Sequence, residues 1–208
     1  MYSSRIPACS KSAPGKWLPQ RGSCWGSVMV SWSKIARRVR VPLGFAFAIL
    51  YFWLARPTAP SILLGAALVV PGLLIRAVAS GQLQKNEQLA TAGPYAYTRN
   101  PLYLGSLILS VGFALAARSW WIVGGIILLF FAIYLPVIRA EEEFLRKRFP
   151  QFEDYARRVP RLFPRVSASG NSGGAFSWDL YWKHREYNAT LGAAAMLLAV
   201  VAKMLLWR

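Results

Sequence analysis

The sequence predicts an all-α fold, a polytopic membrane helical bundle of about five transmembrane helices whose cytoplasmic loops form the functional site. The first observation is that the 208 residues carry a net charge of +17 although 55% of them are hydrophobic. A soluble domain this apolar would need one large core, and a disordered basic chain would lack apolar residues. The second observation is that aromatic residues make up 14% of the chain, as expected where rings gather at the membrane–water interface.

Five apolar stretches justify the helix count, because a helix needs about 20 apolar residues to cross the hydrocarbon core. The first and third stretches are short and borrow length from aromatic flanks such as Tyr51 and Trp53. The second contains Arg76, which we expect either to reach the interface or to serve a function, since a charge inside a span is costly. In chain order the stretches are 41–55, 61–79, 101–117, 120–138 and 189–207.

Positive charge is concentrated on one side of the predicted membrane. Residues 1–40, 81–100 and 139–188 contain eight, two and ten Lys or Arg residues. The other side holds three, namely Arg56, Arg118 and Arg208. By the positive-inside rule the N-terminus and the large loops face the cytoplasm, so we expect a multi-pass protein of a bacterial inner membrane. Contact with anionic membrane lipids accounts for the excess charge, and no nucleic-acid partner is predicted.

The chain divides into four predicted parts. Residues 1–40 mix Ser, Pro, Gly and Lys without periodicity, which is typical of a basic, disordered segment, and Met29 within it is a candidate start of translation. Residues 41–165 form the membrane core. Residues 166–188 are a cytoplasmic linker, and residues 189–208 are a final transmembrane helix.

Residues suited to metal binding or imidazole chemistry are scarce. His184 is the single histidine, and its place in a basic run predicts a solvated side chain. Cys9 and Cys24 lie 15 residues apart without a neighbouring histidine, so they form neither a zinc pattern nor a disulfide framework. We therefore expect no metal site and no Ser/His/Asp triad.

Residues 93–105 are the first cytoplasmic segment whose side chains suit catalysis or ligand binding. Gly93 and Asn100 each precede a proline, which favours extended or turn backbone, and Pro101 suits the first turn of the next helix. The sequence therefore places a turn and a helix start at the membrane surface. A purely structural alternative is a rigid entry turn in which the tyrosines of the segment are interfacial anchors.

The second segment begins with three consecutive carboxylates, Glu141, Glu142 and Glu143, at the end of a predicted span. Successive helical residues are about 100° apart, so the three cannot all face outward, and one or two should face the bundle. They also oppose the positive charge expected on this side. The alternative is that they only pair with neighbouring arginines, such as Arg139 or Arg146.

Together the two segments resemble the isoprenylcysteine carboxyl methyltransferase family and the related membrane phospholipid methyltransferases. The resemblance rests on Gly-Pro-Tyr-x-Tyr-x-Arg-x-Pro-x-Tyr-x-Gly at 93–105, then, after a helical hairpin, Glu-Glu-x-x-Leu at 141–145 and Val-Pro-x-x-x-Pro at 159–164. It covers about residues 60–165. Asn100 stands where the eukaryotic carboxyl methyltransferases usually have His.

The resemblance implies an S-adenosylmethionine-dependent methyltransferase of the membrane. Its acceptor would be lipid-like or prenylated, with a carboxylate or an amine to be methylated at the cytoplasmic interface. The resemblance also implies the residues that enclose S-adenosylmethionine, which in this sequence are Tyr95, Tyr97, Arg99, Asn100, Pro101, Tyr103, Leu104, Glu141 and Glu142.

The chemistry of this cofactor suits those side chains. A carboxylate such as Glu141 or Glu142 matches its ammonium group, Arg99 matches its carboxylate, and Tyr97 or Tyr103 can stack on adenine or face the sulfonium. We assign catalytic roles to Arg99 and Glu142. A carboxylate acceptor needs only alignment and loss of its water shell, whereas an amine must be deprotonated, which Glu142 can assist.

Two other classes of function stay open at this point. A membrane reductase of the sterol-reductase type has a similar Gly-Pro-Tyr and Arg-x-Pro-x-Tyr segment and binds NADPH, although a phosphate-rich cofactor favours Arg and Lys over a run of Glu. A non-enzymatic membrane protein, whose loops only anchor it, would bind neither nucleotide.

The charge distribution yields a topology prediction. Reporter domains fused at Arg56 and at Arg118 should be located outside the cytoplasm, because these positions lie in the connections poor in positive charge. Protease protection of the fusions in intact cells is the measurement. Cytoplasmic reporters at both positions would overturn the five-span arrangement.

Overall fold

Helices make up nearly all of the regular structure in this computed structural model, which describes residues 42–84, 88–167, 173 and 175–206. No β-strand occurs among them, which confirms the predicted all-α class. The basic segment 1–40, with Met29, lies outside the described residues. The helices and helical turns, in chain order, are Pro42–Leu54, α2 (Ala59–Ser80), the 3-10 turn η1 (Gly93–Ala96), α3 (Pro101–Ala117), α4 (Trp120–Leu129), the π-helical turn η2 (Phe130–Tyr134), α5 (Leu135–Arg148), α6 (Phe152–Arg158), α7 (Trp178–Lys183) and α8 (Tyr187–Leu206).

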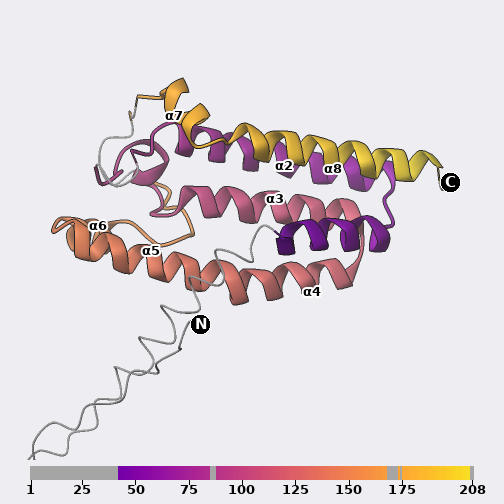
Figure 1. The fold of residues 1–208 in the computed structure, drawn as a ribbon, viewed down its shortest axis with the longest axis horizontal. Coiled ribbons are helices and arrows are strands. Elements are labelled where there is room, and N and C mark those ends of the chain that lie inside the picture. Colours follow the sequence, from indigo (N-terminus) through magenta and orange to yellow (C-terminus); the bar gives the residue numbers. More distant parts are fainter. Residues whose placement is uncertain (1–41, 85–87, 168–172, 174, 207–208) are drawn as a thin grey trace, which may run out of the picture.

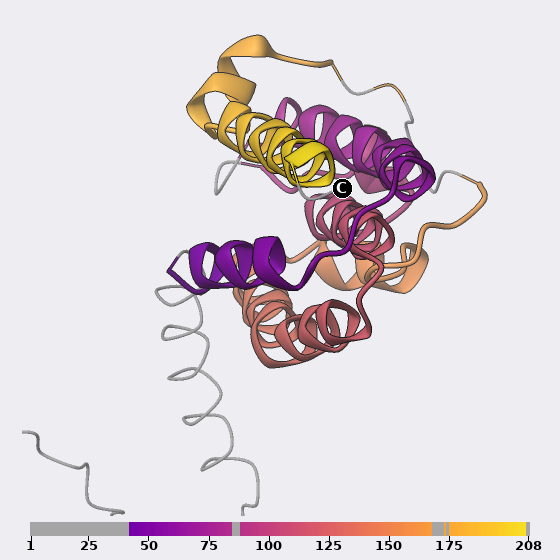
Figure 2. The same cartoon turned by 90° about the vertical axis from the view of Figure 1, so that its right-hand side faces the viewer.

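The long helices run side by side, and the connections between them gather at the two ends of the bundle (Figure 1). The end that carries η1, α6 and α7 holds the long connections, whereas the opposite end holds the short turns and the end of α8. Helix α2 packs on α3 and α8, and the view along the helices places α3 between α2 and the α4–α5 helix (Figure 2). The described parts of the basic connections therefore share one end, as the charge distribution predicts.

The five predicted spans coincide with five apolar helices. Three of these are long and apolar enough to cross a membrane, namely Ala59–Ser80, Trp120–Arg148 and Tyr187–Leu206. The other two, Pro42–Leu54 and Pro101–Ala117, are shorter. The fourth span was predicted to end at residue 138, but its helix continues without interruption through the glutamates to Arg148. The carboxylates are thus carried rigidly by the span itself.

Helices α2 and α3 approach closely because glycines face each other across their contact. A Cβ atom added to Gly65 would lie 2.6 Å from the carbonyl oxygen of Gly112, and one added to Gly72 would lie 2.9 Å from that of Gly105. Small residues that let backbones touch are the usual means of packing helices inside a membrane, where burial of apolar surface supplies little drive. The two glycine pairs fix the register of α2 on α3.

Apolar side chains cover the outside of the bundle as well as its interior. Leu63 of α2 and Leu198 of α8 are 71% and 69% exposed, as expected of surfaces that face lipid. At the end of the bundle opposite η1, Tyr51, Ile122 and Val200 are buried together in one apolar cluster. This cluster joins the helix Pro42–Leu54 to α4 and α8.

The segment 166–188, predicted as a linker, contains α7 and is attached to the end of α2. The backbone N–H of Ser177 donates to the carbonyl of Gly81 at 2.9 Å, and the ring of Phe176 lies against Gly81 where a Cβ would otherwise be. The final helix begins at Tyr187, two residues earlier than predicted. A segment that looked like a connection in the sequence therefore covers part of the bundle.

The glycine contact generates a stability prediction. Gly112→Ala should lower the unfolding temperature in detergent micelles and cost about 1–3 kcal/mol, because its Cβ would meet the backbone of α2. Gly124→Ala on α4 is the matched control, since a Cβ there meets nothing within 4 Å. Equal unfolding temperatures for the two variants would contradict the close α2–α3 contact.

Candidate functional site

A polar cavity of about 920 Å³ lies at the end of the bundle that carries η1 and α6. Its walls come from the end of α2, the segment that leads into α3, the first turns of α3, the start of α5, and α6. The turn between α7 and α8 adds His184 and Glu186. Elements far apart in the sequence thus form one compartment, of the size that holds a small molecule or a cofactor.

A buried carboxylate, Glu142 of α5, is the centre of one wall. It is 4% exposed, and three side chains from other elements surround it. Arg161 donates from Nε to Glu142 Oε2 at 2.8 Å, Asn100 Nδ2 donates to Oε1 at 3.3 Å, and Arg99 Nη1 lies 3.5 Å from Oε1. The predicted pair of Arg99 and Glu142 is therefore in contact in the folded protein.

Backbone hydrogen bonds bring the two sequence motifs to this carboxylate. The N–H of Arg99 donates to the carbonyl of Pro160 at 2.9 Å, and Thr98 Oγ1 donates to that of Leu162 at 3.0 Å. Gly93 has a φ of 59°, a left-handed conformation that favours glycine, and it starts the turn that leads to them. The segment after α6 thus runs beside the segment before α3 and locks it in place.

Tyr95 and Tyr155 support the same turn from beneath. Tyr155 is buried on α6, and its hydroxyl donates to the carbonyl of Tyr95 at 2.8 Å. Burial raises the pKa of Tyr95, and Tyr155, Glu141 and Glu186 raise it further. Burial also raises the pKa of Tyr155, against the opposing charge of Arg99. Both phenols therefore stay protonated at neutral pH and act as hydrogen-bond donors.

Two charged groups of the cavity have capacity left for a ligand. The Nε atom of Arg99 is buried without a hydrogen-bond partner among the described residues. Glu141 lines the cavity, and within the described part of the chain its carboxylate forms no ion pair or hydrogen bond. Buried polar groups are normally satisfied, so a donor and a carboxylate that have no partner among the described residues and line the same cavity indicate a site for a ligand that carries both charges.

The opposite wall is formed by Arg76, Ser106 and Glu186. Arg76 of α2 and Glu186 form an ion pair of 2.9 Å, and Arg76 also donates to Ser106 Oγ of α3. His184, expected to be solvated, is half-buried, and its Nδ1 lies 3.2 Å from the carbonyl of Ser80. The expectation was wrong because a basic run in the sequence does not reveal that α7 folds back onto α2.

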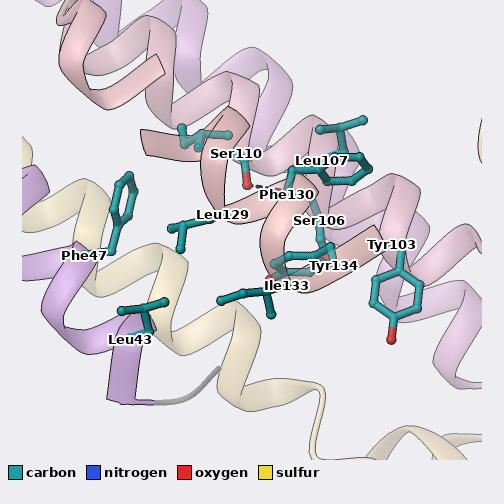
Figure 3. Close-up of a pocket in the computed structure, with 12 residues that line it drawn as sticks. Leu43, Phe47, Tyr103, Ser106, Leu107, Ser110, Leu129, Phe130, Ile133 and Tyr134 are labelled. Atoms are coloured by element: carbon teal, nitrogen blue, oxygen red, sulfur yellow. Dashed lines mark hydrogen bonds between the residues drawn. The ribbon is translucent and has the colours of Figure 1, made fainter. Parts of the chain in front are cut away.

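An apolar pocket of about 150 Å³ adjoins the polar cavity (Figure 3). It lies between the helix Pro42–Leu54, α3 and the α4–η2 region, and Figure 3 shows Phe47 and Leu129 at its wall. Tyr103, Ser106 and Tyr134 line both compartments. The polar cavity and the apolar pocket are therefore neighbours that share these three residues as a common wall.

Six of the nine predicted cofactor residues line the cavity, namely Tyr95, Arg99, Asn100, Tyr103, Glu141 and Glu142. The other three, Tyr97, Pro101 and Leu104, do not line it. Pro101 is buried at the first turn of α3, and the backbone of Tyr97 accepts a hydrogen bond from Arg165. Pro101 and Tyr97 therefore belong to the backbone that carries the lining residues, without lining the cavity themselves.

Sequence reasoning missed Arg161 and Glu186. Arg161 lies between the prolines of the Val-Pro-x-x-x-Pro motif, which contributed to the family resemblance but did not indicate a charged contact. Glu186 carried no motif at all, and it meets Arg76 across 110 positions of sequence. Within the described residues, no group of three or more His, Cys, Asp or Glu side chains is placed to hold a metal ion.

The comparisons with known proteins identify the class. A family model described as phospholipid methyltransferase matches residues 61–151, which contain α3, the π-helical turn and both cavity glutamates of α5. The chain belongs to this family of membrane methyltransferases, and the predicted resemblance is confirmed.

Two curated relatives extend the comparison. The chain is 38% identical over 173 residues, 79% of this chain and 78% of the relative, to the cobalt-zinc-cadmium resistance protein CzcN of Cupriavidus metallidurans. It is 40% identical over 84 residues, 40% of this chain and 39% of the relative, to the nickel-cobalt-cadmium resistance protein NccN of Alcaligenes xylosoxydans xylosoxydans. No solved structure matches the chain.

The hydrogen bond from Tyr155 to the Tyr95 carbonyl generates a stability prediction. Tyr155→Phe should lower the free energy of unfolding by about 1 kcal/mol, because it leaves the Tyr95 carbonyl without its buried donor. Tyr97→Phe is the control, since that hydroxyl makes no hydrogen bond with a described residue. Thermal unfolding in micelles measures both, and a Tyr155→Phe variant as stable as the control would show that the bond does not support the turn.

Proposed function

We propose that this protein transfers a methyl group from S-adenosylmethionine to a lipid-like acceptor at the cytoplasmic surface of the membrane. The family supports methyl transfer in a membrane protein. The observation that carries the finer proposal is that a charged cavity and an apolar pocket lie next to each other and share Tyr103, Ser106 and Tyr134 as lining residues. A polar cofactor and an apolar chain can then be held next to each other.

The charged side chains of the cavity match the charged groups of S-adenosylmethionine. The unpartnered Nε of Arg99 suits the carboxylate of S-adenosylmethionine, and the free carboxylate of Glu141 suits its ammonium. Tyr103, which lines both compartments, offers an aromatic face to a cation or to adenine. When bound, S-adenosylmethionine supplies an electrophilic methyl group.

The protein's own residues then provide orientation and exclusion of water. Glu142 fixes Arg99 by an ion pair of 3.5 Å in a buried setting, so the guanidinium is held before any ligand arrives. Asn100 is hydrogen-bonded both to Glu142 and to the carbonyl of Arg161, which sets the start of α3 against the cavity. Such fixed geometry is the main contribution an enzyme makes to an in-line displacement.

The apolar pocket supports an acceptor with a hydrocarbon chain. Leu43, Phe47, Leu129 and Ile133 are among the side chains that line it. An acyl or prenyl chain that enters from the bilayer gains affinity from burial there and keeps its head group at the shared boundary. The π-helical turn shapes this boundary, since it includes Tyr134, and π-turns are frequent at functional sites.

The charge of the cavity disfavours the reductase alternative. Glu141, Glu142 and Glu186 line it together with only two arginines, Arg76 and Arg99. Each of these arginines already pairs with a carboxylate, and Glu141, which has no ion pair among the described residues, would repel the phosphates of NADPH. Calorimetric titration of the purified protein should show binding of S-adenosylmethionine and none of NADPH.

The names of the two relatives suggest the cellular setting. Both are called metal resistance proteins. We propose that a part played by this chain in metal resistance would act through methylation of a membrane component.

The catalytic assignment is tested by two substitutions. Arg99→Ala and Glu142→Ala should each lower methyl transfer by at least about 100-fold, because the first removes the guanidinium proposed to bind the cofactor and the second removes the carboxylate that holds this guanidinium in place. The measurement uses purified protein in its native lipids with radiolabelled S-adenosylmethionine, followed by separation of the lipid and protein products.

Glu143→Ala is the matched control for this test. Glu143 is the next residue of α5, and it is exposed and paired only with Lys147 on the surface. It should retain the wild-type rate. Wild-type rates in all three variants would rule out the Arg99–Glu142 pair as the catalytic centre.

A further inference from the structure

Arg76 lines the charged cavity and contacts a residue that also lines the apolar pocket. Its Nη1 donates to Ser106, and Ser106 lines both compartments. The stem of Arg76 crosses α3 over Gly105, where an added Cβ would lie 2.7 Å from Arg76 Cγ. The helix contact thus leaves a space shaped for this side chain. A lipid whose tail fills the apolar pocket would present its head group to this guanidinium.

The hydrogen-bonding capacity of Arg76 is already used by the protein. Its Nη2 donates to Oε1 and Oε2 of Glu186 at 2.9 Å each, and its Nε donates to Oε2 at 3.2 Å. On the other side its Nη1 donates to Ser106 and to the carbonyl of Leu102. The planar fork that would bind the carboxylate of a ligand therefore already holds one from the chain itself.

The backbone around Glu186 is built to deliver that carboxylate. Arg185 has a φ of 54°, a left-handed conformation that non-glycine residues rarely adopt. On one side of this residue His184 contacts the carbonyl of Ser80, and on the other side α8 begins at Tyr187. The turn is therefore held at both ends. The side chain of Glu186 within this turn is 12% exposed and forms the ion pair with Arg76.

The segment that supplies Glu186 lies outside the part of the chain that the family model matches. That match ends at residue 151, and the Arg76 partner comes 35 residues later. Arg76 thus lies inside the region that the family model matches, whereas Glu186, which neutralises its charge, lies outside that region. Among the described lining residues, the two arginines each pair with a carboxylate, whereas Glu141 has no ion pair.

We propose that Glu186 is a specificity-determining residue, which occupies the guanidinium of Arg76 and thereby selects an acceptor with an amine head group over one with a carboxylate. The inference rests on the proposed function, because it concerns the acceptor of that reaction. A carboxylate head group would have to displace Glu186 and would face Glu141 as well. An amine head group meets no such barrier and is attracted by the same carboxylates.

The experiment compares lipids that share one chain and differ in the head group. Native mass spectrometry of the purified full-length protein in detergent micelles gives the affinities for oleate and for oleylamine. The wild-type protein should bind oleylamine at least about tenfold more tightly than oleate. Equal affinities, or a preference for oleate, in the wild-type protein would overturn the proposal without any need for a variant.

Substitutions of Glu186 then assign the preference to this residue. Glu186→Gln should bind oleate about tenfold more tightly than the wild type and oleylamine more weakly, because the arginine becomes available to an anion. Glu186→Asp keeps the charge and should keep the preference for oleylamine. Adding Arg76→Gln to Glu186→Gln should remove the gain for oleate.

Two controls separate this role from a structural one. Glu143→Gln makes the same chemical change in an exposed ion pair outside the cavity and should leave both affinities unchanged. If the Arg76–Glu186 pair only held α8 in place, Glu186→Gln would shift both lipids in the same direction, and that result would overturn the proposal. Titration of S-adenosylmethionine on the same preparations tests the methyltransferase function independently, because the lipid affinities are measured without cofactor.

Discussion

The carboxylate of Glu142 is the group on which the arrangement of the site depends. Moving a carboxylate out of water costs several kcal/mol unless charged and hydrogen-bonded partners compensate. Here Arg99, Asn100 and Arg161 supply that compensation from two segments that come before α3 and after α6. The contacts that satisfy this one buried charge therefore hold both segments over the end of the bundle, where they help to form the cavity.

The helices make this arrangement possible because they hold the ends of α2, α3 and α5 at fixed positions. The glycine contact between α2 and α3 sets Arg76 across Gly105, and the uninterrupted helix Trp120–Arg148 carries Glu142 from the apolar region to the cavity. The same helices border the apolar pocket. A charged chamber and an apolar pocket thus share a wall at one end of the bundle, which is the arrangement that the proposed reaction of a polar donor with a lipid requires.

The sequence predicted the parts of this structure that depend on local patterns. Apolar length predicted four of the five helices to within two residues and the start of the fourth at Trp120, although not its end at Arg148, and the proline spacing predicted the start of α3 at Pro101. The triplet of glutamates predicted that one or two carboxylates face the bundle, because three successive helical residues cannot all face outward, and Glu142 is buried while Glu141 lines the cavity beside it.

The remaining features depend on contacts between distant segments, for which the sequence held no local signal. The fold of residues 175–187 onto α2, the pairing of Arg76 with Glu186, and the exclusion of Tyr97 from the cavity all result from tertiary packing. The π-helical turn at Phe130–Tyr134 is likewise invisible in an unbroken apolar run. Helix positions could therefore be predicted, whereas the acceptor side of the site could not.

The central claim is that the cavity between the two motifs holds the methyl donor. Ultraviolet photolabelling of the purified protein with radiolabelled S-adenosylmethionine, followed by peptide mapping, tests it most directly. The account predicts label in the peptides that contain residues 93–105 and 135–148, and suppression of the label by excess unlabelled cofactor. Saturable labelling confined to other parts of the chain, or no saturable labelling at all, would contradict it.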